Sequence, residues 1–483
     1  MHLKKIALAL SLILTITASS ISSDKAYAQN LAIPDIGTAG VMGLSVQKEQ
    51  QIGDFFMRTA RAYMPIIDDP VLSEYVQSLG NKLLINANHV NFPFEFFIVN
   101  DQSLNASAFL GGKLRINTGL LFYCDTEDEF ASVLSHEISH VTQRHIARFI
   151  ESQSQKNNLT IGALIGAIAM SIINPAVGMA ALSTTMGASV QSSINFTRDN
   201  EYEADRLGID LLYKSGFNPK GMTDMFKKLL ANQGNINPAF TLLIDHPLTE
   251  IRVSEARSRV MQLPKRQNSK NVDFYFAKAR SDVRYMKTKP DSIINKINIK
   301  GINESYDNYA KALAYYELKD YAKASFYLDK LEKVKDNLFI LDLKTDILIA
   351  QNKYDSAINM LLNAKKRSPK NKTISLNLAN AYMQKGLNDK AINTLLKFLN
   401  YQNDDITALS MLSDLYFLVN KRCEGLQARG KILALSANYN HAILQFNEAL
   451  NICSDFYVKE KIKAQVSQIA NQRAFDEVLN SSF

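Results

Sequence analysis

Two histidines one helical turn apart, with a glutamate beside the first, are the residues of this chain best suited to chemistry. In the segment His136-Glu137-Ile138-Ser139-His140, both imidazoles share one face of a helix and can bind the same Zn²⁺ ion. Glu137 projects beside that metal, where its carboxylate can accept a proton from water whose pKa zinc lowers to about 7. The pattern predicts a zinc-dependent hydrolase, although two histidines at this spacing also occur on ordinary helix surfaces.

A third metal ligand is needed, and Glu201 is the best candidate. Glu201 and Asp205 are four residues apart and share one helix face, whereas Glu203 falls on the other side. We expect Glu201 to bind the metal and Asp205 to orient a ligand histidine through its second ring nitrogen. His145 comes nine residues after His136, about 180° round a continuous helix, and is expected to point away as a solvated or packing histidine. Without the histidines, the acidic segment would be interpreted as a salt-bridged surface helix.

His246, which precedes a proline, and Arg252 form a third group of interest. One interpretation places His246 near the metal, where it stabilises the oxyanion of a tetrahedral intermediate or fills the fourth metal position of a latent enzyme. Arg252 would then pair with Glu201 or with a substrate carbonyl. The alternative is a histidine that anchors its loop, where proline restricts the backbone, and an arginine on the surface.

Two short strands are expected before the histidine helix. The aromatic run 94–99 and the segment 113–117 have strand character, and a glycine pair separates the second strand from a loop at 105–110. The second strand is a candidate edge on which an extended substrate peptide adds as a further strand. An internal strand is the competing interpretation. The substrate-edge candidates are Asn105, Gly112, Lys113, Leu114 and Arg115.

The histidine helix begins with a recognisable start signal. Thr126 followed three residues later by Glu129 forms a capping box, and apolar residues then recur at helical spacing. The polar, basic segment 264–270 lacks any periodicity and marks a domain boundary. We therefore expect one α+β domain at residues 29–264 to carry the metal site.

Residues 265–483 are predicted to be helical and repetitive. Ala324, Ala357 and Ala391 recur at nearly equal intervals, and a leucine follows each alanine one helical turn later. A small residue at such a position lets two helices approach closely, so this regular recurrence predicts a tetratricopeptide-repeat (TPR) solenoid. Ala312 and Ala379 occupy a second small position, and the middle repeat departs from the pattern with Thr345 there. An ordinary helical bundle is the alternative.

The N-terminus has the pattern of a secretory signal peptide. Lys4 and Lys5 precede an apolar run from Ile6 to Ala18, and an Ala-x-Ala site ends at Ala28. The run is shorter than the roughly 20 residues that a membrane span needs, so residues 1–28 are expected to be cleaved. Export predicts the periplasm if the source is a Gram-negative bacterium.

The charge of the chain is divided unevenly. The formal net charge of +8 and pI of about 9.0 invite a nucleic-acid hypothesis. However, residues 29–264 carry 18 Lys and Arg against 23 Asp and Glu, whereas residues 265–483 carry 34 against 23. The high pI belongs to the repeat region, and export argues against nucleic acid as a partner. An acidic protein partner, or the acidic N-terminal domain itself, suits that basic region better.

The cysteines and one apolar stretch leave alternatives open. Cys423 and Cys453 both lie in the C-terminal region and can pair in an oxidising compartment, whereas Cys124 is expected to be a small buried residue. Residues 159–190 belong to the long stretch between Lys156 and Arg198 that carries no charge. They form either a buried helical hairpin or a pair of short helices that contact a membrane surface or an apolar partner.

Together these motifs resemble peptidase family M48, a family of gluzincin metallopeptidases. The resemblance rests on His136-Glu137-x-x-His140, followed further along the chain by Glu201-x-Glu203-Ala204-Asp205. Asn105-Ala106, Gly111-Gly112, and His246-Pro247 with Arg252 also match the family pattern. The implied fold class is an α+β gluzincin-type metalloprotease domain followed by an all-α TPR solenoid. One Zn²⁺ per chain is implied at His136, His140 and Glu201, with Glu137 as the general base.

The resemblance also implies a function in the cell. For an M48 peptidase with this architecture, the resemblance implies quality control of outer-membrane β-barrel proteins. Unfolded or stalled barrels would be the clients, and the assembly machinery would be a partner of the repeats. The competing hypothesis is a chaperone or assembly scaffold that acts mainly through repeat-mediated binding. An integral-membrane peptidase, resting on residues 159–190, is a third hypothesis.

Overall fold

The computed structural model describes residues 44–157, 165–169, 198–233, 240, 242, 246–299, 301–334 and 336–481. The expected signal peptide lies outside these residues. Of the apolar stretch 159–190 only 165–169 is described, and this short segment is helical with Ile165 buried. Among the described helices, none combines the length and the apolar character that a membrane span requires.

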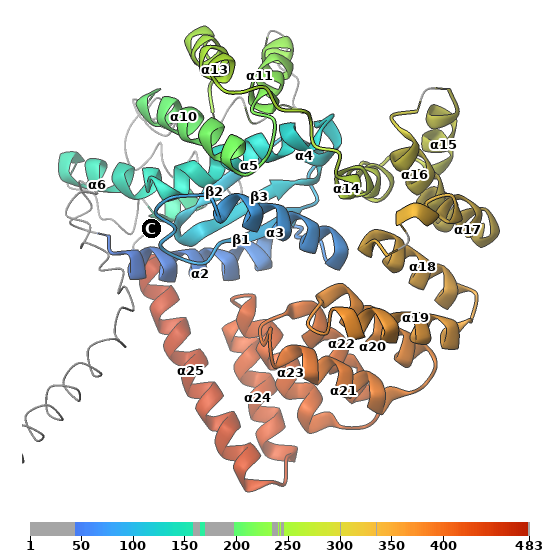
Figure 1. Cartoon of the computed structure of the whole chain (residues 1–483). Helices are drawn as coiled ribbons and strands as arrows, with labels where there is room; N and C mark the ends of the chain where they lie inside the picture. Colours follow the sequence, from blue (N-terminus) through green and yellow to red (C-terminus); the bar gives the residue numbers. More distant parts are fainter. Residues whose placement is uncertain are drawn as a thin grey trace, which may run out of the picture. The chain divides into compact units, whose positions relative to one another are not determined.

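A small mixed sheet lies at the centre of the N-terminal half of the chain (Figure 1). Strand β1 (Glu95–Val99) pairs in parallel with β3 (Lys113–Asn117), and β2 (Ala106–Phe109) pairs with the other side of β3 in the antiparallel sense. Both strands predicted from the sequence are confirmed. The expected loop at 105–110 was wrong, because β3 supplies a hydrogen-bonding partner to residues whose own strand propensity is weak.

The expectation that the second predicted strand offers a free edge is also wrong. Strand β3 lies in the middle of the order β1-β3-β2, with a strand on each side, and all five of its residues are buried. In the described sheet, the side of β2 that does not pair with β3 therefore faces groups from outside the sheet. Asn105 directly precedes β2 and is buried, whereas Gly112 lies in the connection between β2 and β3. The candidates that the sheet order removes are Lys113, Leu114 and Arg115.

The glycine pair makes the connection between β2 and β3 possible. Gly111 and Gly112 both have positive φ, 70° and 74°, a conformation that residues with a Cβ rarely adopt. A Cβ at Gly112 would also lie 2.8 Å from the carbonyl oxygen of Pro93. The connection is further covered by α2 (Val46–Tyr63), whose Gly53 leaves room for the carbonyl of Leu110. Gly112 thus shapes the turn rather than an edge.

Helix α5 carries the histidine motif and is buried along its whole length. Its Thr126 cap accepts a hydrogen bond from the amide of Glu129, and the Glu129 carboxylate accepts one from the amide of Asp125. The predicted helix start is confirmed, with the return bond reaching one residue further back than a capping box requires. The helices of this half are α2 (Val46–Tyr63), α3 (Pro70–Leu84), α4 (Thr118–Tyr123), α5 (Glu127–Thr142), α6 (His145–Asn157), α10 (Arg198–Lys214), α11 (Lys220–Gln233) and α13 (Glu250–Gln262).

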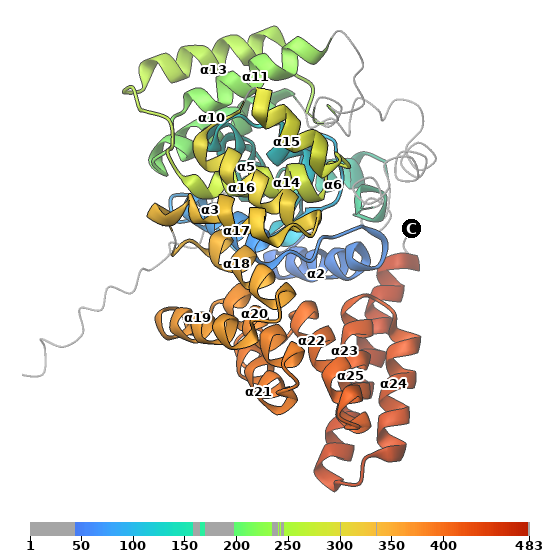
Figure 2. The same cartoon turned by 90° about the vertical axis from the view of Figure 1, so that its right-hand side faces the viewer.

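The rest of the described chain is helical, as predicted, and its helices follow one another in pairs (Figure 2). Ala324, Ala357 and Ala391 are completely buried, and so are the residues at the second small position, Ala312, Thr345 and Ala379. The helices are α14 (Val272–Arg284), α15 (Pro290–Ile299), α16 (Glu304–Glu317), α17 (Tyr321–Asp329), α18 (Leu338–Ala350), α19 (Tyr354–Arg367), α20 (Lys372–Gln384), α21 (Asn388–Leu399), α22 (Ile406–Leu418), α23 (Arg422–Leu435), α24 (Tyr439–Ile452) and α25 (Phe456–Ser481).

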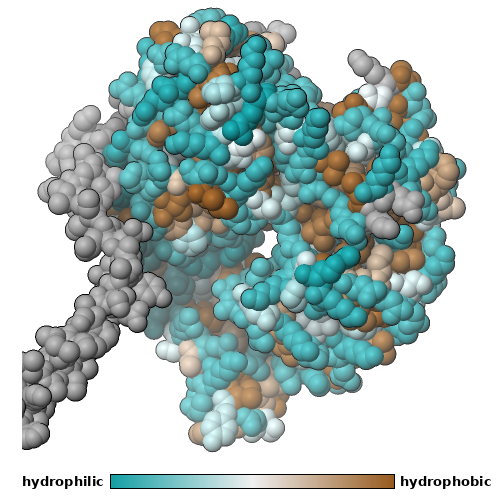
Figure 3. Space-filling model, viewed as in Figure 1, coloured by the Kyte–Doolittle hydropathy of each residue, from teal (hydrophilic) through white to brown (hydrophobic). Residues whose placement is uncertain are grey.

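The repeat half is joined to the N-terminal half by shared packing. The expected boundary near residue 264 falls in the coil between α13 and α14, yet one buried apolar cluster extends from Val71 to Ile347. Within it, Arg280 of α14 places Nε 2.5 Å from Asp69 and Nη1 2.7 Å from Asp342. Asp69 caps α3 and Asp342 belongs to α18, so one buried guanidinium pairs with both halves. Hydrophilic side chains cover most of the surface in Figure 3.

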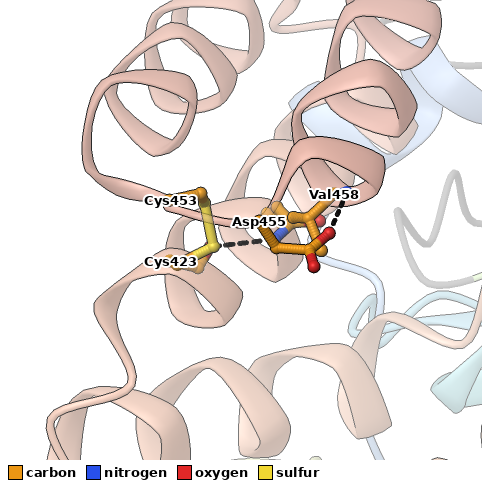
Figure 4. The surroundings of a disulfide bond; sticks show 5 residues. Cys423, Cys453, Asp455 and Val458 are labelled. Atoms are coloured by element: carbon orange, nitrogen blue, oxygen red, sulfur yellow. Dashed lines mark hydrogen bonds between the residues drawn. A yellow bond between two sulfur atoms is a disulfide. The ribbon is translucent and has the colours of Figure 1, made fainter.

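The C-terminal helices are connected by a disulfide between Cys423 of α23 and Cys453 at the end of α24 (Figure 4). The two Cα atoms are 5.3 Å apart, which confirms the pairing that the sequence left open. Cys124 is buried and free, as expected. Asp476 of α25 pairs with Arg58 of α2 at 2.8 Å, a second link between the repeats and the N-terminal half.

Asp346 of α18 gives the repeat half a pH-dependent stability. Burial and the neighbouring charge of Asp342 raise the pKa of Asp346 from 3.8 to about 7. The native chain then holds a proton that the unfolded chain has released, so this group's contribution to stability falls as pH rises from about 4 to about 7. Arg284, 3.6 Å away, opposes the shift without cancelling it.

An Asp346→Asn variant tests this assignment, because an amide cannot ionise. We expect its Tm, measured relative to the wild type, to be higher at pH 8 than at pH 5. Thermal unfolding at both pH values provides the measurement, and Asp336→Asn, at a largely exposed carboxylate, is the control. A Tm difference that is the same at both pH values would contradict the raised pKa.

Candidate functional site

Four buried side chains converge beside α5. His136 and His140 extend from α5, Glu201 from α10 and His246 from the coil before α13, and one ligand atom from each lies within 4.8 Å of the others. The Nε2 atoms of the α5 histidines are 3.0 Å apart, and each lies 3.5 Å from an oxygen of Glu201. The structure therefore brings together the three predicted metal ligands, and His246 with them.

Glu201 reaches the histidines because α10 packs closely against α5. Gly208 lies at their contact, and a Cβ there would be 3.3 Å from both the Cα and the backbone nitrogen of His136. Helical spacing then places Glu201 and Asp205 on the face of α10 that points to α5, and both are buried.

Asp205 lies between His136 and an arginine. Its Oδ1 atom is 3.0 Å from Nδ1 of His136, the ring nitrogen that faces away from the cluster. Arg252 of α13 donates two hydrogen bonds to the same carboxylate, at 2.7 and 2.9 Å. Its Nη1 also lies 2.9 Å from Glu201, so Arg252 is a buried partner of both carboxylates rather than a surface residue.

Glu137 is placed between the cluster and the sheet. The backbone amide of Ala108 in β2 donates a hydrogen bond of 3.0 Å to Glu137 Oε2, while Oε1 lies 3.3 Å from Nε2 of His246. This carboxylate therefore contacts the outer side of β2 and the metal-ligand cluster at once. The contact could not be found from the sequence, because the pattern gave no sign of strand β2.

His246 contacts the carboxylates of Glu201 and Glu137. Its Nδ1 atom is 3.0 Å from Glu201, and its ring is buried. It also lies 3.4 Å from Nε2 of His136. This geometry places His246 next to the metal-ligand atoms, as the first of the two sequence-based interpretations required.

The expected orientation of His145 is wrong. Helix α5 ends at Thr142, and Arg144 adopts a positive φ of 54°, so the chain turns before α6 begins. The His145 ring is consequently buried, with Nδ1 2.8 Å from Nδ1 of His140 and Nε2 3.1 Å from Glu203. The prediction from helical spacing failed because it assumed one continuous helix. The prediction did not include the tight turn that the chain makes at Gln143 and Arg144.

The protonation preferences of the cluster suit a cation. Burial would lower the pKa of His136, but hydrogen bonds to Asp205 and Glu201 raise this pKa to about 10. Burial would raise the pKa of Glu201, yet the neighbouring His246 and His140 rings bring it well below the ordinary value. Burial and neighbouring imidazoles lower the pKa of His140, which favours a neutral ring. The carboxylates thus favour a positive charge at His136, and a divalent transition metal would replace that proton and bind to imidazole nitrogens and an ionised carboxylate.

Comparison with known proteins assigns the family. Residues 70–260 match the family model described as peptidase family M48, and residues 348–415 match a tetratricopeptide-repeat model. Over 446 residues the chain is 37% identical to the beta-barrel assembly-enhancing protease of Yersinia pestis, covering 91% of this chain and 92% of that protein. Against the Escherichia coli K12 protein of the same name, the identity is 38% over 424 residues, with 86% of each chain covered.

The chain belongs to peptidase family M48. It is therefore a metallopeptidase, and the cluster on α5 and α10 is where the described residues could hold its metal. The metalloprotease LoiP of Escherichia coli is 27% identical over 194 residues, which are 40% of this chain and 73% of LoiP. The TPR match confirms the repeat prediction, and the ordinary helical bundle was the wrong alternative.

Loss of the Asp205 carboxylate should weaken metal binding by this M48 domain. Asp205→Asn removes the negative charge that faces Nδ1 of His136 and pairs with Arg252, and the neutral amide left in its place holds the ring less firmly; comparable losses cost about 10- to 100-fold in metal affinity. We expect this reduction for Asp205→Asn in a chelator competition with Zn²⁺. Asp210→Asn on the same helix, at a partly exposed carboxylate, should bind as wild type does. Equal affinity of the two variants would contradict the assignment.

Proposed function

We propose that this M48 metallopeptidase is a zinc-dependent endopeptidase that cleaves unfolded or stalled outer-membrane β-barrel proteins. The observation that carries this proposal is the convergence of His136, His140 and Glu201 beside Glu137, whose carboxylate also contacts strand β2. A hydrolase needs both a metal centre and a nearby proton acceptor, and this arrangement supplies the two groups side by side.

One Zn²⁺ per chain is the proposed cofactor, held by His136, His140 and Glu201. Two imidazole nitrogens and one carboxylate oxygen form a ligand set typical of catalytic zinc sites, which keep a further position open. When bound, Zn²⁺ polarises a peptide carbonyl and makes water a stronger acid. Asp205, held by Arg252, would keep the proton of the His136 ring on Nδ1. The Nε2 atom, which faces the cluster, would then be free to bind the metal.

The outer side of β2 is the proposed binding surface for substrate, in place of β3. The amide of Ala108 faces Glu137 instead of β3, so this backbone group lies at the site. An extended peptide can add to such an edge through its own backbone groups, whatever its side chains. Unfolded β-barrel precursors are rich in extended segments, which suits this mode. Of the predicted edge candidates, Asn105 lies next to β2 and remains in the proposal.

Glu137 is the proposed general base and acid. It accepts a proton from the attacking water and then delivers it to the nitrogen of the leaving amine, which restores the carboxylate. The contact of Glu137 with the Ala108 amide keeps it beside the peptide that β2 would hold. His246 is proposed to occupy the fourth metal position of a resting enzyme, and substrate binding would have to displace it.

The names of the relatives and the N-terminal sequence support a proposal for the cellular setting. Two relatives that match along most of their length are named beta-barrel assembly-enhancing proteases, which supports β-barrel precursors as clients. We propose export by residues 1–28, a periplasmic location, and a catalytic domain at 29–264. The repeat domain at 265–483 would bind the outer-membrane assembly machinery. Residues 159–190 would provide peripheral membrane contact, and we propose no nucleic-acid partner.

A scaffold function is the second candidate, and one observation favours it. His246 contacts both Glu201 and Glu137, so in this conformation the site is shared with a residue of the chain itself. If that state predominates, binding by the basic repeats would be the main activity and proteolysis would be latent.

A Glu137→Gln variant separates the two functions. We expect it to keep the zinc content of wild type and to lose proteolysis of an unfolded protein such as casein by about 10²- to 10⁴-fold. Metal analysis and peptide release provide the measurements, and Glu95→Gln, a carboxylate that pairs with Arg61 away from the cluster, is the control. Full biological activity of Glu137→Gln would support the scaffold and contradict proteolysis as the main function.

A His246→Ala variant tests the latent state. If His246 fills a metal position in the resting enzyme, its removal should raise basal proteolysis while zinc remains bound by the other three ligands. We expect a several-fold increase in the initial rate on an unfolded substrate, with zinc content unchanged. His441→Ala, at an exposed histidine of α24, is the control. Unchanged proteolysis and unchanged zinc affinity would show that His246 only anchors its loop.

A further inference from the structure

The two α5 histidines of the cluster are supported in different ways. His136 contacts the carboxylate of Asp205 directly, at 3.0 Å, and Arg252 pairs with that carboxylate. His140 contacts a second imidazole instead, since Nδ1 of His145 lies 2.8 Å from its Nδ1 atom. Behind His145 there is again a carboxylate paired with an arginine.

The second chain of contacts runs from α5 through α6 to α10. Nε2 of His145 lies 3.1 Å from Oε2 of Glu203, and the same oxygen accepts a hydrogen bond of 2.9 Å from Arg148. The His145 side chain is fully buried, while Glu203 and Arg148 are partly exposed. An inner imidazole thus connects the cluster to an ion pair at its rim.

The positions of the protons in this chain follow from the role of His140. If His140 binds a metal through Nε2, which faces His136 and Glu201, its Nδ1 atom must carry the hydrogen. Two ring nitrogens at this separation can form a hydrogen bond only if one of them lacks a proton, so Nδ1 of His145 must accept. The proton of His145 is then on Nε2, where it faces the Glu203 carboxylate.

We propose that His145 is a positioning residue that fixes the tautomer and ring orientation of His140 and connects this ring to the Glu203–Arg148 ion pair. The inference rests on the proposed zinc site. It differs from the support of His136, because a neutral imidazole rather than a carboxylate is the immediate acceptor. It also gives Glu203 a function, although its helix face points away from the metal ligands.

Zinc binding by the full-length protein tests this role. His145→Phe fills the volume but removes the acceptor, whereas His145→Asn places an amide oxygen near the position of Nδ1 and can still accept from His140. We expect His145→Phe to weaken Zn²⁺ binding about 10- to 100-fold in chelator competition, and His145→Asn to recover most of that loss. Glu203→Gln should weaken binding less than His145→Phe does, and Asp210→Asn on the same helix is its control.

A spectroscopic measurement separates positioning from a loss of packing. In the Co²⁺-substituted protein, we expect the visible absorption bands to change in His145→Phe and to resemble wild type in His145→Asn. Equal zinc affinity and equal Co²⁺ spectra of wild type and His145→Phe would overturn the inference, as would equal losses in the Phe and Asn variants. A wild-type protein that binds no Zn²⁺ would overturn the proposed zinc site as well.

Discussion

The buried carboxylate of Asp205 joins three helices at the site, because it contacts a ring of α5 and a guanidinium of α13 from its own position on α10. An ionised carboxylate removed from water is stable only where charges and hydrogen bonds replace its hydration. Arg252 supplies two charged donors and the ring of His136 supplies a third contact. A rotation of His136 would leave this charge incompletely paired, so the carboxylate fixes the direction in which the ring presents its other nitrogen.

The sheet contributes a different constraint. Strand β3 pairs with β1 on one side and with β2 on the other, and β2 is the strand that lies beside Glu137. Gly111 and Gly112 permit the tight return that aligns β2 with β3 in the antiparallel sense. The cluster and a strand edge therefore meet at the carboxylate of Glu137, which is why the proposed substrate surface lies on β2.

The repeats are part of the same packed structure as the M48 domain. Arg280 is buried between Asp69, which caps a helix of the N-terminal half, and Asp342, which belongs to the repeats. Removal of one partner from such a group would leave an uncompensated charge in the interior, which costs several kcal/mol. Together with the shared apolar cluster, this contact makes the repeats a structural support of the M48 domain.

The sequence by itself determined the features that depend on residues close together in the chain. Helical spacing was sufficient to pair His136 with His140, and to place Glu201 and Asp205 on one face, because the pitch of the α-helix fixes these relations locally. The period of the repeats was equally accessible, since each buried alanine occupies the same place in its own helix pair.

Only the tertiary structure decided the features that depend on distant partners or on a break in a helix. Strand β2 forms because β3 lies beside it, and its small residues give no periodic signal of their own. His145 faces His140 because Arg144 turns the chain out of α5, which reverses the direction expected from a continuous helix. The spacing within each helix was therefore local information, whereas the approach of Glu201 and His246 to the two α5 histidines, the groups that orient these rings and the edge that faces them were fixed by long-range packing.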